Sequence, residues 1–209
     1  CWAVNVENQL LVGAGVSRRL SPNVGGAFEP PNPDTIVIHY TDGDSVEAAV
    51  NTLCDPARKV SAHLVVGRAG ELVQLVPFDT VAWHAGESRW GDRQQFNHFS
   101  LGVEVQNAGK LEEHSGRFLS SLGIEYPPEE VYAAVHRNQV ESAFWHRFPA
   151  LQLEVVERVC GLLVASFGID HILGHEEIAP GRKIDPGPAF PLDQLRHRLL
   201  YRAAPGPPT

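Results

Sequence analysis

The run TIVIHY at residues 35–40 constrains the fold more than any other stretch of this chain. Its β-branched and aliphatic side chains are typical of a short buried strand. A helix is predicted directly after it, because apolar residues recur with helical spacing from Val46 to Leu53, and Asp42 or Asp44 offers an N-cap. The ordered part of the chain therefore begins with a strand followed by a helix.

Beyond that helix, the sequence predicts strands, helices and loops that alternate without an internal repeat. The segment 151–168 carries the strongest helical pattern, and Gly168 is a natural C-cap. Residues 131–135 fit either a strand or a helix. The remaining expected elements are a hairpin at 61–67 and 72–76, a loop at 80–98, strands at 100–106 and 172–173, and a last helix at 191–201.

This order of elements indicates a single α/β domain. Residues 1–34 lack a clear period, and we expect them to form an N-terminal arm on the domain. The domain itself is predicted to cover residues 35–203. The Pro- and Gly-rich residues 204–209 are expected to form a flexible tail.

Charge and hydropathy exclude several classes of partner. The formal net charge of the 209-residue chain is −8, which disfavours a general nucleic-acid or anionic-membrane binder, because such proteins present basic surfaces. No apolar run approaches the roughly 20 residues needed to cross a bilayer, so we expect no transmembrane segment. Three cysteines are too few for a disulfide framework. We expect the chain to act as a monomer.

Four of the ten histidines stand out by their context, namely His63, His84, His39 and His175. His39 ends the buried strand, where a rigid scaffold presents a functional group to an open loop. His175 begins a segment, rich in Gly, Pro and charged residues, that leads to Asp185, and such a stiff polar backbone is typical of a preorganised site. Together His39, His175 and Asp185 form a two-His, one-carboxylate set, which suits a catalytic zinc or the iron of an oxygenase.

Several ordered motifs surround these residues and resemble one known family, the type-2 N-acetylmuramoyl-L-alanine amidases. This family includes bacterial muropeptide amidases, phage amidase lysins and animal peptidoglycan recognition proteins. The resemblance runs from about residue 34 to residue 195, and its most specific blocks are AWHAG and APGRKIDPGP. The matching segments are TIVIH at 35–39, VSAH at 60–63, QLVP at 74–77, AWHAG at 82–86, Asn97, SLGVE at 100–104, and GH at 174–175 with APGRKIDPGP at 179–188.

The resemblance implies a mixed β-sheet flanked by helices, with Zn²⁺ in a surface groove. By position, His39, His175 and Asp185 match the family's metal ligands. Glu104 matches the catalytic carboxylate, and Lys183 matches the basic residue two positions before the metal-binding Asp. The implied reaction is hydrolysis of the amide bond between N-acetylmuramic acid and L-alanine in peptidoglycan or muropeptides.

Four further residues are predicted to contact this substrate. Trp83 and His84 belong to the loop expected to form the groove. Arg182 suits a substrate carboxylate, because its planar fork matches one geometrically. Asn97 is expected to hold the peptide backbone of the substrate. His63 is expected to face the sheet interior or to support the site.

Two features depart from the family pattern. Gln95 stands where the cytosolic recycling enzymes of the family carry an Arg, and Arg93 is the nearest candidate to replace it. The segment 107–150 is longer than a minimal member requires. Two other functions stay open at this point, a recognition module that binds peptidoglycan without cutting it and a zinc hydrolase acting on another amide.

Overall fold

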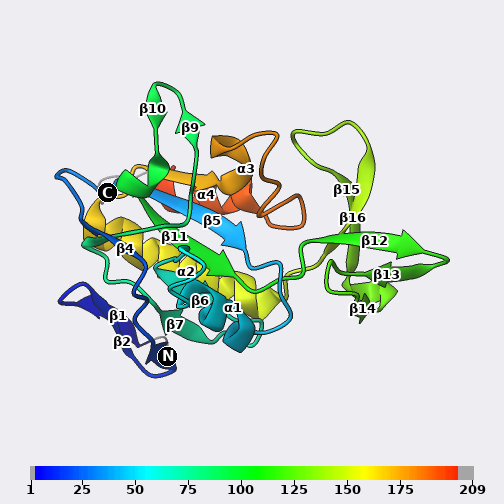
Figure 1. Ribbon diagram of the computed structural model, residues 1–209, viewed down its shortest axis with the longest axis horizontal. Helices are drawn as coiled ribbons and strands as arrows, with labels where there is room; N and C mark the ends of the chain where they lie inside the picture. Colours follow the sequence, from blue (N-terminus) through cyan, green and yellow to red (C-terminus); the bar gives the residue numbers. More distant parts are fainter. Residues whose placement is uncertain (1–2, 202–209) are drawn as a thin grey trace, which may run out of the picture.

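The computed structural model describes residues 3–201, so the expected tail at 204–209 lies outside the described residues. Its central mixed sheet has six strands, and the inner strands of the sheet can be followed side by side in Figure 1. In spatial order they are β17 (His171–Gly174), β5 (Thr35–Tyr40), β11 (Ser100–Val105), β6 (Leu64–Val66), β7 (Leu72–Gln74) and β3 (Val16–Arg18). The first four strands are parallel, β7 is antiparallel to β6, and β3 is parallel to β7.

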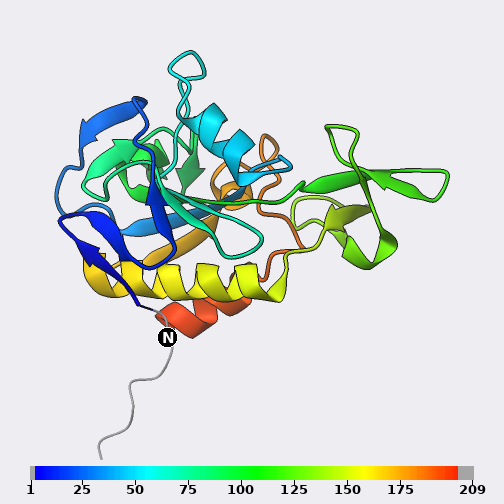
Figure 2. The same ribbon diagram turned by 90° about the horizontal axis from the view of Figure 1, so that it is seen from below.

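Helices cover both faces of this sheet. Figure 2 shows α2 (Ala150–Phe167) and α4 (Leu192–Leu200) on one side of the sheet and α1 (Val46–Leu53) on the other. Ile36 and Ile38 of β5 belong to the same hydrophobic cluster as the buried face of α2. Side chains alternate between the faces of a strand, so Val37 and His39 point to the opposite face. The predicted single α/β domain with a mixed sheet flanked by helices is confirmed.

Most of the expected elements are present, with corrections at their ends. The strand at 35–40 and the hairpin of β6 and β7 occur as predicted. The N-cap of α1 is Ser45, whose hydroxyl accepts a hydrogen bond from the Ala48 N–H at 3.1 Å, so the prediction of Asp42 or Asp44 was wrong. The ambiguous residues 131–135 form a strand, and Gly168 caps α2 in the left-handed conformation.

The long segment between β11 and α2 folds into a second sheet, which we call the insert sheet. Its five strands are antiparallel and project from the body of the molecule (Figure 1). In spatial order they are β14 (Glu125–Tyr126), β13 (Arg117–Leu119), β12 (Lys110–His114), β16 (Ser142–His146) and β15 (Val131–Val135). The departure in length at 107–150 therefore corresponds to an added structural unit.

Short elements fill the segments that were expected to be irregular. The N-terminal region contains β1 (Val4–Glu7), β2 (Leu10–Gly13) and β4 (Val24–Ala27) as well as β3, which is an edge strand of the central sheet. The expected loop at 80–98 contains β8 (Thr80–Ala82), β9 (Arg89–Trp90), β10 (Arg93–Gln94) and η1 (Phe96–His98). The other short helices are η2 (Pro128–Glu130) and α3 (His175–Ile178). Among residues 3–201, none of the helices has the length and apolarity to cross a membrane.

Candidate active site

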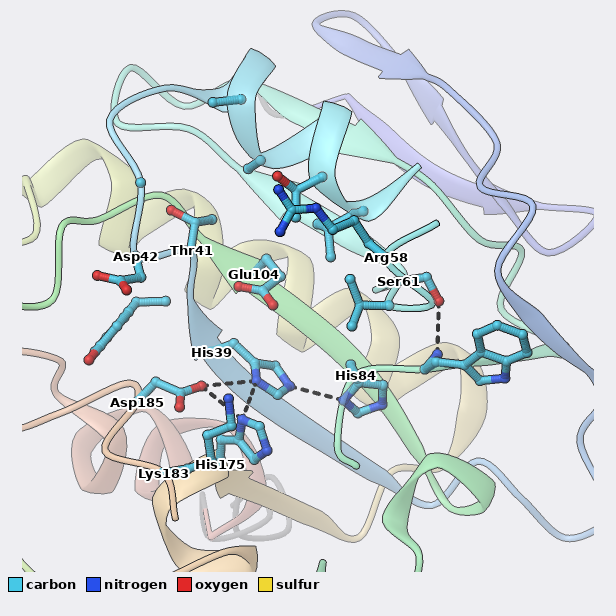
Figure 3. Close-up of a pocket in the computed structure, with 18 of the residues that line it drawn as sticks. His39, Thr41, Asp42, Arg58, Ser61, His84, Glu104, His175, Lys183 and Asp185 are labelled. Atoms are coloured by element: carbon cyan, nitrogen blue, oxygen red, sulfur yellow. Dashed lines mark hydrogen bonds and ion pairs between the residues drawn. The ribbon is translucent and has the colours of Figure 1, made fainter. Parts of the chain in front are cut away.

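A groove of about 800 Å³ opens at the carboxyl ends of β5 and β11. Figure 3 shows most of the residues that line it, which come from β5, β11, α1, the loops that follow β5, α1 and β8, and the segment after β17. The parallel pairing of β5 with β11 places Glu104 opposite His39. The pairing of β5 with β17 places Gly174 opposite Ile38, so His175 follows directly beside His39. Register thus brings together residues that are far apart in the sequence.

Three candidate metal ligands converge at the bottom of the groove (Figure 3). The Nδ1 atoms of His39 and His175 lie 2.9 Å apart. The Oδ2 atom of Asp185 lies 3.0 Å from each of them. All three side chains are buried, and they are the set that the sequence predicted. These three atoms form a nearly equilateral triangle, so a single ion could contact all three.

The protonation of the two imidazole rings decides whether this triangle suits a metal. Nε2 of His175 lies 3.0 Å from the carbonyl oxygen of Ala85, which only accepts hydrogen bonds. Nε2 of a neutral His175 therefore carries the hydrogen, and its Nδ1 lone pair points into the triangle. Burial and the neighbouring His175 lower the pKa of His39 to about 4, which keeps that ring neutral at neutral pH. Lone pairs converging on one point fit a bound cation.

Asp185 supplies the negative charge of this set. Burial alone would raise its pKa, but the facing rings of His175 and His39 outweigh burial and hold the pKa well below its ordinary range. Two neutral imidazoles and one ionised carboxylate are a common ligand set for catalytic zinc, which keeps a fourth position for water or substrate. The residues present therefore fit zinc.

Glu104 lies beside the triangle with one oxygen that has no protein partner. Its Oε2 is buried and makes no hydrogen bond, which is costly for a carboxyl group unless a ligand or water completes the site. Burial raises the pKa of Glu104 well above its usual value, the charge of Asp185 raises it further, and Lys183 lowers it. Lys183 also lines the groove, and Figure 3 shows its side chain beside His175.

Three of the four residues predicted to contact substrate line the groove, namely Trp83, His84 and Arg182. Trp83 is half-buried, and its backbone N–H donates to the Ser61 hydroxyl at 2.8 Å. Arg182 donates to the carbonyl oxygens of Ala85 and Glu87, so it holds the loop after β8 against the segment that carries Asp185. Their contact with substrate stays a prediction.

The side chains of His84 and Asn97 also have protein partners, as that of Arg182 does. Nδ1 of His84 lies 2.9 Å from Nε2 of His39, and its own Nε2 lies 3.2 Å from the Ser100 carbonyl oxygen. The side-chain oxygen of Asn97 accepts from the backbone N–H groups of His84 at 3.0 Å and Ala85 at 2.7 Å. Asn97 does not line the groove. Direct contact with substrate stays a prediction for both residues, and the structure gives each a role in holding the groove loop.

Sequence reasoning did not single out several of the residues that line the groove. Arg58, next to the VSAH motif, and Leu122, in the insert sheet's β13–β14 turn, both line the groove. Proximity to a family motif was a signal for Arg58, whereas nothing in the sequence places Leu122 there. Arg93 donates to both carboxylate oxygens of Asp34, at 2.9 and 2.7 Å, and does not line the groove, so it does not replace the missing Arg at position 95.

His63 was predicted either to face the sheet interior or to support the site, and it faces the interior. Its Nδ1 accepts from the Gly102 N–H at 3.0 Å, and its Nε2 lies 2.8 Å from the Thr80 carbonyl oxygen. Its ring lies between those of Phe28 and Phe78. It makes no contact with the triangle.

Comparison with known proteins agrees with this geometry. A sequence profile of the family described as N-acetylmuramoyl-L-alanine amidase (Amidase_2) matches residues 29–188. The 1,6-anhydro-N-acetylmuramyl-L-alanine amidase AmpD of Escherichia coli (strain K12) is 29% identical over 213 residues, covering 93% of this chain and 96% of that protein. The AmpD of Salmonella typhimurium (strain SL1344) is 36% identical over 142 residues, which are 68% of this chain but only 57% of that relative.

Solved structures are similar over nearly the whole chain. A selenomethionine AmpD derivative superimposes with a TM-score of 0.65 at 25% identity, covering 93% of this chain and 98% of that one. The Escherichia coli amidase AmiD, in complex with anhydro-N-acetylmuramic acid-L-Ala-D-γ-Glu-L-Lys, gives a TM-score of 0.62 at 26% identity, with 94% and 66% covered. Profile, sequence and structure agree, and the chain belongs to the N-acetylmuramoyl-L-alanine amidase (Amidase_2) family.

Proposed function

We propose that this chain is a zinc-dependent hydrolase that cleaves the amide bond between N-acetylmuramic acid and L-alanine in peptidoglycan or muropeptides. The observation that carries the proposal is the triangle of His39, His175 and Asp185 beside the unpartnered oxygen of Glu104. Membership of the family supports it. So do the AmpD relatives, whose name specifies a 1,6-anhydro-N-acetylmuramyl-L-alanine substrate.

The metal would be held by Nδ1 of His39, Nδ1 of His175 and Oδ2 of Asp185. Zinc in such a site lowers the pKa of water to about 7 in favourable cases and polarises a carbonyl group. The chain's own residues then have to place the amide, move protons and accommodate charge.

Glu104 is the proposed proton carrier. Its Oε2 takes a proton from the attacking water and delivers it to the nitrogen of the leaving L-alanine amine. A carboxyl group can both accept and return a proton near neutral pH only when its pKa lies above the usual value, and burial shifts Glu104 in that direction. Because Oε2 has no protein partner, it is free for this exchange.

Lys183 is the proposed electrostatic partner of the lactyl carbonyl. Negative charge develops on that oxygen as water adds to the carbonyl carbon. A fixed ammonium group near this position stabilises the charge without reorganisation. The position of Lys183 on the groove wall, two residues before Asp185, supports this role.

The decisive experiment measures zinc content and peptide release in the same preparations. Wild-type protein, Glu104→Gln and His175→Ala are incubated with sacculi and with soluble anhydro-muropeptides, and products are identified by mass spectrometry. We expect about one zinc and free stem peptide from wild type. Glu104→Gln should keep zinc and lose release, whereas His175→Ala should lose both.

Unchanged release by either variant would contradict the assigned mechanism. Zinc binding by wild type without cleavage of any muropeptide would contradict the hydrolase and favour a recognition module. A comparison of the two substrates also separates an enzyme of the intact wall from one of soluble fragments.

A further inference from the structure

A buried chain of hydrogen bonds runs from His39 through His84 to Ser100. Nε2 of His39 lies 2.9 Å from Nδ1 of His84. Nε2 of His84 lies 3.2 Å from the carbonyl oxygen of Ser100 and 3.2 Å from its hydroxyl oxygen. All three residues are buried, so water does not compete for these bonds. Figure 3 shows the contact between the two histidine rings.

The far end of this chain fixes the direction of every bond in it. The Ser100 hydroxyl donates to the carbonyl oxygen of Phe96, so both Ser100 oxygens act as acceptors toward His84. Nε2 of His84 must therefore carry the hydrogen, and Nδ1 of the neutral ring accepts. Nε2 of His39 in turn donates, which leaves Nδ1 of His39 unprotonated and directed into the metal triangle.

The ring of His84 is fixed by its surroundings as well as by these bonds. The ring of His84 packs against the backbone of β11 at Gly102. A Cβ atom at Gly102 would lie 2.4 Å from Cγ of His84, so only glycine at position 102 leaves room for the ring. Asn97 holds the backbone N–H groups of His84 and Ala85. Both the backbone and the side chain of His84 are therefore constrained.

We propose that His84 is a positioning residue that fixes the tautomer and the ring orientation of His39 and so prepares Nδ1 to bind zinc. The inference rests on the proposed function, because it assumes the zinc site. Partners behind a metal-bound histidine commonly set its tautomer, and their loss typically costs 10- to 100-fold in metal affinity. His84 would thus affect catalysis by orienting the zinc ligand His39, and not by contacting the substrate.

Two substitutions at position 84 each remove one of the two hydrogen bonds of the His84 ring, the one to His39 or the one to Ser100. In His84→Asn the side-chain oxygen takes the place of Nδ1 and still accepts from His39, whereas the bond to Ser100 is lost. In His84→Gln the amide nitrogen takes the place of Nε2 and still donates to Ser100, whereas His39 loses its acceptor. We expect His84→Gln to weaken zinc binding about 10- to 100-fold, and His84→Asn to weaken it less. Zinc affinity is measured on the full chain by competition with a chromophoric chelator.

A matched control is His63→Asn. His63 is an equally buried histidine whose ring centroid lies 6.1 Å from that of His84, and Asn at this position keeps the acceptor for Gly102. We expect this variant to lose stability without losing zinc affinity. Gly102→Ala tests the same idea without changing His84 itself. Its added Cβ should push the His84 ring out of place, and we expect this variant to weaken zinc binding. Thermal unfolding of the metal-free proteins shows which variants are folded.

Proton-detected NMR of the ring nitrogens gives a second measurement that does not depend on substitution. In the zinc-bound protein we expect hydrogen on Nε2 of both His39 and His84. Hydrogen on Nδ1 of His84 would overturn the inference, and so would equal zinc affinity in wild type and His84→Gln, or equal losses in His84→Gln and His63→Asn. Failure of wild type to bind zinc would instead refute the proposed function itself.

Discussion

Glu104 and Lys183 form a coupled pair on the scale of single residues. Lys183 lowers the pKa of Glu104, whereas burial and Asp185 raise it. The balance between these effects sets the pH at which Glu104 loses its proton and can act as a base. The lysine therefore has two effects, one on the developing charge of the substrate and one on the carboxyl group that moves protons.

Replacement of this lysine by a neutral residue should affect both rate and pH dependence. We expect Lys183→Met to lower kcat by about 100-fold or more, with a smaller effect on KM. The base form of Glu104 disappears as the pH falls through its pKa, and removal of the ammonium raises that pKa. The acid limb of the kcat/KM profile should therefore move to higher pH. Lys183→Arg, which keeps the charge, should move it little, and an unmoved limb in Lys183→Met would contradict the coupling.

His63 makes stability depend on pH without taking part in the site. Burial lowers its pKa from 6.5 to about 4. As the pH falls below 6.5 the unfolded chain binds a proton on this ring and the folded chain does not, so stability present above pH 6.5 is lost progressively down to about pH 4. The full loss is on the order of 3 kcal/mol. Denaturant unfolding between pH 7 and 4 should show a flatter dependence in His63→Asn, and identical slopes would refute this account.

Among elements, the turn between β13 and β14 has the most direct effect on the groove. The Ser121 hydroxyl donates to a carboxylate oxygen of Asp42 at 3.0 Å, which holds the turn against the loop after β5. Leu122 is 61% exposed and lines the groove. An exposed leucine held at the mouth of a groove offers apolar surface to whatever binds there. The insert thus contributes Leu122 to the lining of the groove.

Removal of this apolar surface should weaken substrate binding. Burial of part of a leucine side chain against a ligand is worth about 1 kcal/mol, so we expect Leu122→Ala to raise KM for muropeptides about fivefold with kcat unchanged. Val140→Ala is the control, because Val140 is 93% exposed in the same insert and does not line the groove. Steady-state kinetics measure both variants, and equal KM values would show that Leu122 does not touch substrate.

The accuracy of the sequence-based predictions also differs between elements. The strands at 35–40 and 100–105 and the helix at 150–167 were predictable, because each has a continuous or periodic apolar pattern. The N-cap was not, because Asp42, Asp44 and Ser45 all have suitable side chains and only the path of the loop selects one. Four strands of the insert sheet were not predicted, and residues 131–135 were left open between strand and helix, since these strands contain two to five residues and depend on pairing partners. The edge strand β3 depends on β7, which lies more than 50 residues away.

The candidate site was predictable only through the motifs that surround its residues. His39 and His175 are separated by 136 positions, and no local pattern relates them. The family resemblance placed both, together with Asp185 and Glu104. It did not give the bonding directions behind His39, because these follow from the carbonyl of Ser100 and from the space that Gly102 leaves.

At the scale of the whole molecule, the insert sheet is connected to the candidate metal site. His136 lies next to β15, and its Nε2 is 2.7 Å from a carboxylate oxygen of Glu176, which also accepts from the Gly187 N–H at 3.0 Å. A Cβ atom at Gly187 would lie 2.8 Å from the ring of Trp145. Glu176 follows His175, and Gly187 lies two residues after Asp185. The insert sheet therefore supports both segments that carry these ligands.

Metal removal should lower the stability of the whole molecule without unfolding it. Hydrophobic clusters hold the helices against the central sheet, so the metal-free chain should keep its helices and strands. A ligand at 100 times its Kd adds about 2.7 kcal/mol to stability. We expect a chelator to lower Tm, and excess zinc to restore it, in circular dichroism melts. In His175→Ala, zinc should not change Tm, and a Tm of wild type that is independent of zinc would contradict a structural contribution of the metal.

The parallel pairing of β17, β5 and β11 has a consequence for the order of folding events. The three strands are adjacent in the sheet, yet chain closure over more than 100 residues is needed before His175 meets His39. Non-local pairing of this kind forms slowly. The proposed zinc ligands come together only when these distant segments have paired, so we do not expect zinc to nucleate the fold, in contrast to small domains that fold around their metal. If the chain binds zinc as proposed, we expect metal uptake to follow the pairing of β17 with β5.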